Sequence, residues 1–112
     1  MKISITEILK VVLFESQINE ETKNINIEEA IRLVKASNGA IFTVLFTKKD
    51  GSDRLMNARL GVKKHLRGGD LPYDPVAKGL LPVFDMQIKQ YRMISLSKIK
   101  NVKINNNIYN VV

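Results

Sequence analysis

The clearest pattern of apolar and polar positions covers residues 40–61, where two apolar-rich runs flank Lys49-Asp50-Gly51. Asp-Gly between such runs is a strong hairpin signal, because glycine adopts positive φ without a Cβ penalty. A two-residue loop at Asp50-Gly51 would place Phe46 beside Leu55. A three-residue loop with Gly51 left-handed instead gives one entirely apolar face, made of Phe42, Val44, Phe46, Met56, Ala58 and Leu60. We therefore predict the three-residue loop. The opposite face is then mixed and available to water or a partner, with Thr43, Leu45, Thr47, Leu55, Asn57 and Arg59.

Helical spacing dominates the residues before this hairpin. Ser4 and Glu7 have the spacing of a capping box, and apolar residues then recur with a helical period at Ile5, Ile8, Leu9 and Val12. Residues 11–14 are β-prone and leave a strand as the alternative, but the pattern favours a helix. The polar residues 17–24 indicate a loop. Asn26 then predicts the start of a second helix, and Asn38-Gly39 its left-handed end.

The residues after the hairpin indicate further strands. We predict a third strand over Leu80–Met86, with Pro82 at the strand start or on an edge, and a fourth over Tyr91–Leu96. Ser95–Ile99 suits one tight helical turn. A final hairpin, Asn101–Asn105 with Ile108–Val112, turns at Asn106-Asn107 and places Val102, Ile104, Tyr109 and Val111 on one face.

These elements predict an α+β fold in which two N-terminal helices precede five to six short strands. Strands of this number and length usually close into a small antiparallel barrel, which removes exposed sheet edges. At 112 residues the chain forms one folded domain. We expect residues 1–39 to be a helical segment that packs on a barrel formed by residues 40–112.

Charge separates the same two segments and changes the functional picture. Residues 1–39 hold five Lys or Arg against six Asp or Glu, whereas residues 40–112 hold thirteen against five. A basic module attached to a near-neutral segment suggests a polyanionic partner, DNA or RNA above all, with simple solubility as the competing explanation. The chain has no cysteine, which fits a reducing cytoplasm. We expect no signal peptide and no membrane partner, because no apolar stretch approaches the roughly 20 residues that span a bilayer.

The candidate nucleic-acid-binding residues follow this basic segment. The densest cluster precedes Gly68-Gly69, whose lack of side chains allows a phosphate backbone to approach closely. A tyrosine could stack on a base, although half-buried packing is the more common role of such a ring. The predicted contact residues are Arg54, Arg59, Lys63, Lys64, His65, Arg67, Lys89, Tyr91 and Arg92.

Catalytic chemistry finds little support in the residue types. His65 is the single histidine, and without cysteine it cannot form ordinary zinc geometry or a thiol dyad. The aspartates of residues 50–85 are scattered, and turn chemistry explains Asp50 and Asp74. Gly68-Gly69 lacks the frame of a phosphate-binding loop. We therefore expect no enzyme activity, no metal and no cofactor.

Several blocks resemble a known family. Lys49-Asp50-Gly51 with Arg54 and Met56, and Phe84-Asp85-Met86 with the segments Tyr91-Arg92 and Ile94-Ser95-Leu96, are similar to a small family found in bacteriophages and their bacterial hosts. That family is described as Sm-like with an SH3-like β-barrel, and is distantly related to the WYL domains of bacterial regulators. The resemblance covers roughly residues 40–104. It implies the barrel and little chemistry, and the Trp-Tyr-Leu signature of the larger WYL domains is missing here.

Together these observations favour a non-catalytic nucleic-acid-binding or regulatory module, encoded by a phage or mobile element and acting in the host cytoplasm. The alternative is a protein-interaction module that modulates a host or phage complex or self-assembles as a homo-oligomer. Leu45 and Leu55 on the outer face of the hairpin, and the amphipathic first helix, motivate this alternative.

Overall fold

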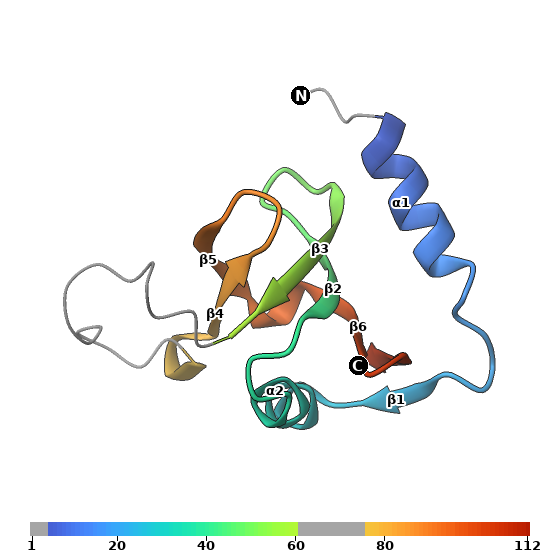
Figure 1. The fold of residues 1–112 in the computed structure, drawn as a ribbon. Helices are drawn as coiled ribbons and strands as arrows, with labels where there is room; N and C mark the ends of the chain where they lie inside the picture. Colours follow the sequence, from blue (N-terminus) through green and yellow to red (C-terminus); the bar gives the residue numbers. More distant parts are fainter. Residues whose placement is uncertain (1–4, 61–75) are drawn as a thin grey trace.

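The computed structural model describes residues 5–60 and 76–112. Within these residues the chain forms two α-helices, seven strands and two short 3₁₀ turns. Figure 1 shows the helices beside a bent sheet. In chain order the elements are α1 (Ile5–Glu15), β1 (Lys23–Ile25), α2 (Ile27–Ala36), β2 (Phe42–Thr47), β3 (Asp53–Arg59), η2 (Val76–Lys78), β4 (Leu80–Asp85), β5 (Gln90–Ser95), η3 (Leu96–Lys98), β6 (Ile99–Ile104) and β7 (Asn107–Val111).

The strands form one mixed seven-stranded sheet in the order β1-β7-β6-β2-β3-β4-β5. The sheet is not closed, because β1 and β5 stand at its two ends and do not pair with each other. The prediction of two helices followed by a closed antiparallel barrel of five to six strands is therefore wrong. The strand missed by the sequence is β1, which lies between the helices and pairs in parallel with β7. Three residues, two of them polar, give no alternation that a pattern could reveal.

The β2–β3 hairpin has the predicted three-residue loop. Lys48 and Ser52 close the loop through a backbone hydrogen bond of 2.8 Å, and Gly51 has a φ of 89°. Phe42 lies opposite Ala58 and Val44 opposite Met56. All four of these side chains are buried, so the choice of register by its apolar face is confirmed.

Local signals elsewhere are also confirmed. The side chain of Asn26 accepts a hydrogen bond of 2.8 Å from the Glu29 backbone and caps α2, and Asn38 and Gly39 both have positive φ beyond its end. The tight turn before the last hairpin is η3. The turn of that hairpin falls at Asn105 and Asn106, one residue earlier than predicted. Moving the turn by one residue shifts the pairing between the two strands by two residues. Side chains alternate with a period of two, so the predicted set of residues still shares one face of the hairpin.

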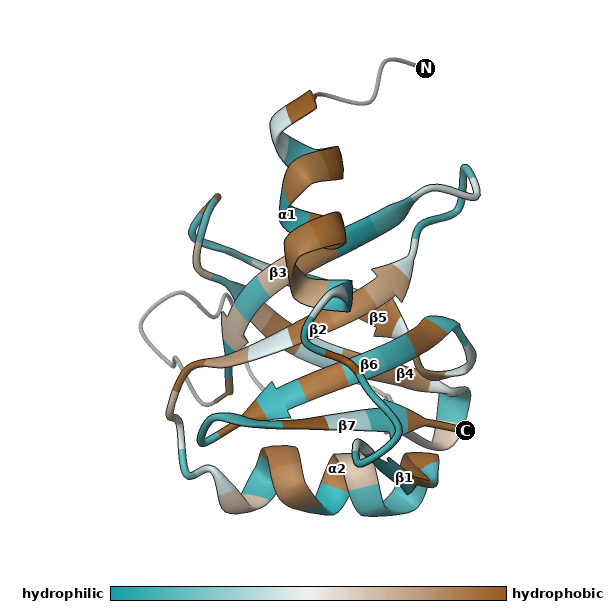
Figure 2. Ribbon diagram, turned by 90° about the vertical axis from the view of Figure 1, so that its right-hand side faces the viewer, coloured by the Kyte–Doolittle hydropathy of each residue, from teal (hydrophilic) through white to brown (hydrophobic). Residues whose placement is uncertain are grey.

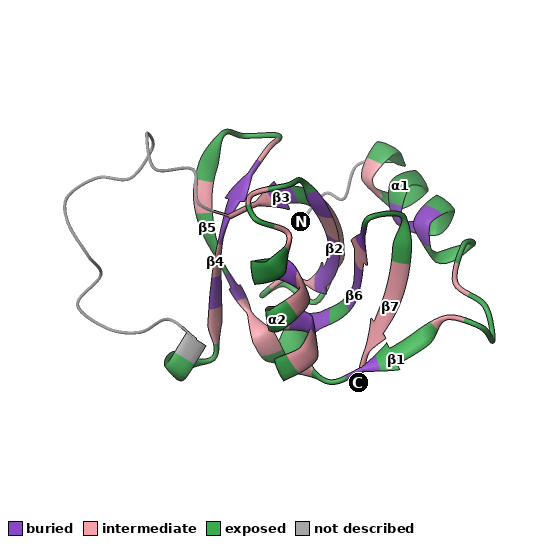
Figure 3. Ribbon diagram, turned by 60° about the horizontal axis from the view of Figure 1, so that its bottom comes forward, coloured by how far each residue is buried: buried purple, intermediate pink, exposed green. Residues whose placement is uncertain are grey.

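The main core lies between the sheet and α2. Ala30 and Val34 of the helix are almost fully buried in one cluster with residues from six of the strands. Figure 3 shows buried segments, in purple, on the strands around α2. The strand residues of this cluster include Phe42, Val44, Met56, Ala58, Val83, Ile94 and Val102. The inner face of the hairpin therefore packs in the same core as α2, together with residues of β4, β5 and β6.

The opposite face of the hairpin is covered by α1. Leu45 has no exposed surface and packs in a second apolar cluster with Val11 and Phe14 of the helix. Figure 2 shows α1 lying across β3 and β2. The outer face of the hairpin, with Leu45 and Leu55, is thus occupied largely by this chain's own helix, and the exposed apolar surface lies instead on α1.

A polar bridge crosses β2 and joins its two neighbours. The Lys100 ammonium of β6 lies 2.9 Å from the Asp53 carboxylate of β3, and the Thr47 hydroxyl of β2 donates to the same carboxylate at 3.0 Å. Desolvation raises the pKa of Asp53, but the hydrogen bonds from Lys100 and Thr47 outweigh it and leave that pKa below its usual value. The hydrogen bond that the Lys100 ammonium donates to Asp53 correspondingly raises the pKa of Lys100.

These shifts predict a pH-dependent contribution to stability. Because the folded pKa of Asp53 is lowered, its contribution is present above the unfolded pKa, near pH 4, and is lost as the pH falls through the folded pKa. The Lys100 contribution is present below its unfolded pKa and is lost as the pH rises through the folded value. We expect Asp53→Asn to lower the free energy of unfolding by about 0.5–1 kcal/mol at pH 7, since both groups are partly exposed.

Urea unfolding of the wild type and Asp53→Asn between about pH 3 and pH 7 measures this contribution. The difference between the two proteins should shrink toward the acid end. Glu20→Gln is the control, because Glu20 is an exposed acid without an ion pair in the described part of the chain. A difference that stays constant with pH would contradict the assignment.

Candidate nucleic-acid interface

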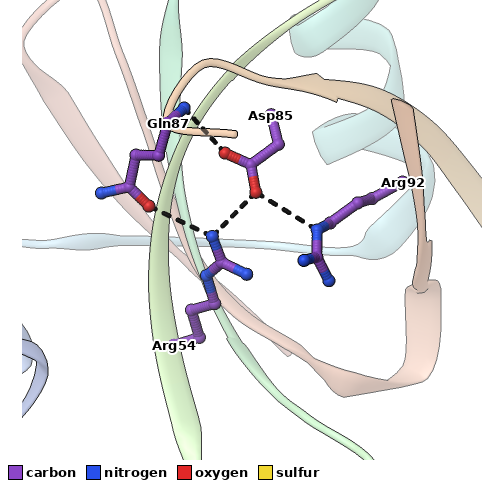
Figure 4. A network of polar contacts seen from close by, with 4 residues as sticks. All are labelled: Arg54, Asp85, Gln87 and Arg92. Atoms are coloured by element: carbon purple, nitrogen blue, oxygen red, sulfur yellow. Dashed lines mark hydrogen bonds and ion pairs between the residues drawn. The ribbon is translucent and has the colours of Figure 1, made fainter. Parts of the chain in front are cut away.

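A buried carboxylate joins polar residues of β3, β4 and β5. The Asp85 side chain, at the end of β4, has no exposed surface. It lies 2.7 Å from Arg54 Nη2 of β3 and 3.3 Å from Arg92 Nε of β5 (Figure 4). The backbone N–H of Gln87 donates to its second oxygen at 2.9 Å. A buried charge is tolerated only when it is paired and hydrogen-bonded in this way.

The same network fixes the turn between β4 and β5. The Gln87 side-chain carbonyl accepts from Arg54 Nη2 at 3.1 Å, and the Lys89 N–H donates to the Asp85 carbonyl at 2.8 Å. Lys89 then takes a positive φ of 55° to let the chain reverse. The network thus holds three strands and one turn in a fixed arrangement around Asp85.

Two guanidinium groups face one carboxylate, so this cluster carries a surplus positive charge. Arg54 is largely buried, with 13% of its side chain exposed, whereas 45% of Arg92 is exposed. Asp85 engages only Nε of Arg92, and no described residue hydrogen-bonds to its two Nη nitrogens. The ion pair through Nε therefore leaves both Nη groups of Arg92 available as donors to an anion.

Arg92 also lines a groove of about 560 Å³ between the tip of the β2–β3 hairpin, β5 and η3. Four basic side chains line this groove, and none of its described lining residues is an acid. Thr47 and Ser95 add hydroxyl groups, and the apolar part of the lining comes from Phe46, Met56, Leu80, Met93 and Ile94. The basic groove is defined by its cations, Lys48, Lys49, Arg92 and Lys98.

Asp50 lies beside the basic groove at the tip of the hairpin. Its carboxylate accepts hydrogen bonds from the Ser52 hydroxyl at 2.5 Å and the Ser52 backbone N–H at 2.9 Å. These two bonds lower the pKa of Asp50. Lys48 lies 3.9 Å from the same carboxylate, at the limit of an ion pair. Ser52 is therefore the principal partner of Asp50, and the Lys48 charge is only weakly compensated.

The structure separates the predicted contact residues. Arg54 and Arg92 meet at Asp85, and Lys89 is exposed in the adjacent turn. Arg59 lies at the far end of β3, next to Gly39, with its Nε atom buried and without a hydrogen-bond partner among the described residues. Lys63, Lys64, His65 and Arg67 lie outside the described residues.

Tyr91 is half-buried and packs its ring edge-on against Phe84, with 5.4 Å between the ring centroids and 70° between the planes. Such a T-shaped pair is a favourable packing arrangement. The geometry therefore gives this ring a packing partner within the protein, and its predicted stacking on a base stays a prediction.

Sequence reasoning missed Lys48, Lys49 and Lys98 as members of one surface. Lys48 and Lys49 lie at the start of a hairpin loop that the sequence predicted, and Lys98 lies in the tight helical turn that it also predicted. The sequence could not show that η3 lies close to the tip of the hairpin. The role of Asp85 was missed for the same reason, since Arg54 lies 31 residues away along the chain.

Comparison with known proteins adds no assignment. No family model matches the chain, and neither a curated protein nor a solved structure matches it. The resemblance to the Sm-like family therefore stays a prediction. Among residues 5–60 and 76–112, no group of three or more His, Asp or Glu side chains is arranged to hold a metal ion. No helix within these residues is long and apolar enough to cross a membrane.

Proposed function

We propose that the protein is a non-catalytic module that binds nucleic acid through the phosphate backbone, which lies in the basic groove. The observation that carries this proposal is the groove itself, where four cations converge without a carboxylate among the described lining residues. Lys and Arg that converge on one surface are the usual footprint of phosphate binding. The ten Lys or Arg against three Asp in residues 40–60 and 76–112 provide a favourable long-range field.

The lining of the groove favours recognition of the backbone over recognition of bases. Phe46 is the only ring among the described lining residues, and it is buried. Base stacking requires an accessible aromatic face. We therefore expect binding with little sequence preference, in which Arg92, held by Asp85, and the three lysines contact phosphates.

Fluorescence anisotropy with labelled duplex and single-stranded oligonucleotides at several salt concentrations tests the proposal. Neutralising about four phosphates should give a slope of log affinity against log salt of about −3 to −4. The proposal would be contradicted if the protein did not bind at about 50 mM salt, or if added salt did not weaken binding.

A charge-matched pair of variants then locates the site. Lys49→Ala with Lys98→Ala removes two exposed groove cations, and we expect at least about a tenfold loss of affinity and a salt slope shallower by about two. Lys23→Ala with Lys35→Ala removes two exposed cations from β1 and α2, outside the groove. Equal losses in the two double variants would place binding elsewhere.

A further inference from the structure

The outward face of α1 is apolar. Five of its large apolar side chains are between 48% and 76% exposed, namely Ile5, Ile8, Leu9, Val12 and Leu13. With about 100° between successive residues, they form one continuous arc opposite the buried Val11 and Phe14. Figure 2 shows this helix as largely hydrophobic along its length.

Such a face departs from the usual pattern of a surface helix. A helix on a sheet normally presents polar residues to water, and a helix that is apolar on both faces is normally covered on both. From the exposed fractions, the five side chains present on the order of 600 Å² to solvent, at the upper end of the patches on monomeric proteins (about 300–600 Å²). We therefore expect another molecule to cover the outer face of α1.

We propose that a second copy of this chain covers it, so that two α1 helices pack against each other between two sheets. The patch contains no charged side chain within its arc, so it is complementary to itself, as a two-fold interface requires. Two such patches would bury about 1,200 Å², the lower end of specific interfaces. The result is a sheet–helix–helix–sheet arrangement, in which every apolar face has a neighbouring layer.

Charge also favours a second copy at this face over other occupants. The protein carries a net charge of +7, so two copies repel each other unless they meet through a surface with few basic residues. Residues 1–39 have five basic residues against six acidic ones, and two lysines of the sheet near the end of α1, Lys100 and Lys103, lie beside Glu15 and Gln17. An approach through the apolar arc of α1 therefore meets little repulsion. A helix that lies on a lipid surface usually has a row of cations on its polar face. The polar residues of α1 include Lys10 alone against Glu7 and Glu15.

Dimerisation through α1 leaves the basic groove open. The groove uses Phe46 and Met56, whereas α1 covers their neighbours Leu45 and Leu55. Successive residues of a strand point to opposite faces, so the two surfaces lie on opposite sides of the hairpin. This proposal therefore goes beyond nucleic-acid binding and does not depend on it.

Sedimentation equilibrium between about 5 and about 500 µM protein tests the proposal. We expect the wild type to show a monomer–dimer equilibrium with a dissociation constant in the micromolar range. Leu9→Glu should be monomeric throughout, with an unchanged circular dichroism spectrum because Leu9 is exposed. Ile88→Glu is the matched control, because Ile88 is an exposed apolar residue in the β4–β5 turn, and it should behave like the wild type. A wild type that stays monomeric, or a dimeric Leu9→Glu, would overturn the proposal.

Single-cysteine variants give a second readout that does not depend on a destabilising change. The chain has no cysteine, so any intermolecular disulfide comes from the introduced residue. Oxidation should link a substantial fraction of at least one of Leu9→Cys and Val12→Cys into dimers, and little of Ile88→Cys. Equal linking at all three positions would reflect random collision and would count against the proposal. Binding of a monomeric wild type to phosphatidylcholine–phosphatidylglycerol vesicles, lost in Leu9→Glu, would also overturn it in favour of a lipid surface.

Discussion

Asp85→Ala is expected to lower the free energy of unfolding by about 3–5 kcal/mol, which corresponds to a fall in the midpoint of thermal unfolding of more than about 10 °C. The reason is the position of Arg54, which is 13% exposed and would keep only the Gln87 carbonyl as a partner. Removing one member of a buried pair leaves the other charge desolvated and uncompensated. Arg92, at 45% exposed, can turn toward water and adds less to the loss.

A thermodynamic cycle separates the charge from the packing. Urea unfolding of Arg54→Met, Asp85→Leu and the double variant should show that the double variant loses far less than the sum of the two single losses. Asp85→Asn keeps the shape of the side chain and should lie between the wild type and Asp85→Ala. A loss below about 1 kcal/mol in Asp85→Ala would mean that water solvates the two arginines and that the buried pair does not hold these strands together.

The parts of the fold that could be predicted from the sequence depend on neighbours close along the chain. Asn26 caps α2 through a residue three positions away, and Gly51 sets the hairpin loop through its own backbone freedom. The register followed because a shift of one would have turned an entirely apolar face away from the core. Each of these features is determined by a few adjacent residues.

The predictions that were wrong or incomplete concern contacts between residues far apart along the chain. The closed barrel was wrong because β1, only three residues long, joins the sheet through parallel pairing with β7 at the far end of the chain. Leu45 was placed on a surface open to water because the sequence could not show that α1 covers it. The basic groove and the Asp85 network share this cause, since their members come from separate strands and turns. Residue type pointed to Arg54 and Arg92, but only the fold brings them to one carboxylate.

Leu45→Ala is the second change with a large expected effect, about 2–5 kcal/mol in the free energy of unfolding. Leu45 is fully buried in the cluster that joins β2 to Val11 and Phe14 of α1. Truncation removes its methyl groups from that cluster and leaves a cavity under the helix, because strand and helix backbones relax only partly. Val12→Ala, on the exposed side of the same helix, should change the stability of the monomer by less than about 0.5 kcal/mol.

Hydrogen exchange tells whether this loss is local to α1 or shared by the whole fold. Val11, Phe14 and Leu45 form a cluster of buried residues separate from the main core, which contains Ala30 and Val34 of α2. We therefore expect Leu45→Ala to reduce amide protection in α1 well before α2, because the helix loses its main anchor while the main core keeps all its contacts. Equal loss of protection in both helices would show that the two clusters unfold as one unit. In a dimer joined through α1, the same variant would also weaken self-association although Leu45 touches no surface, because the helix that presents the apolar face would no longer be held in place.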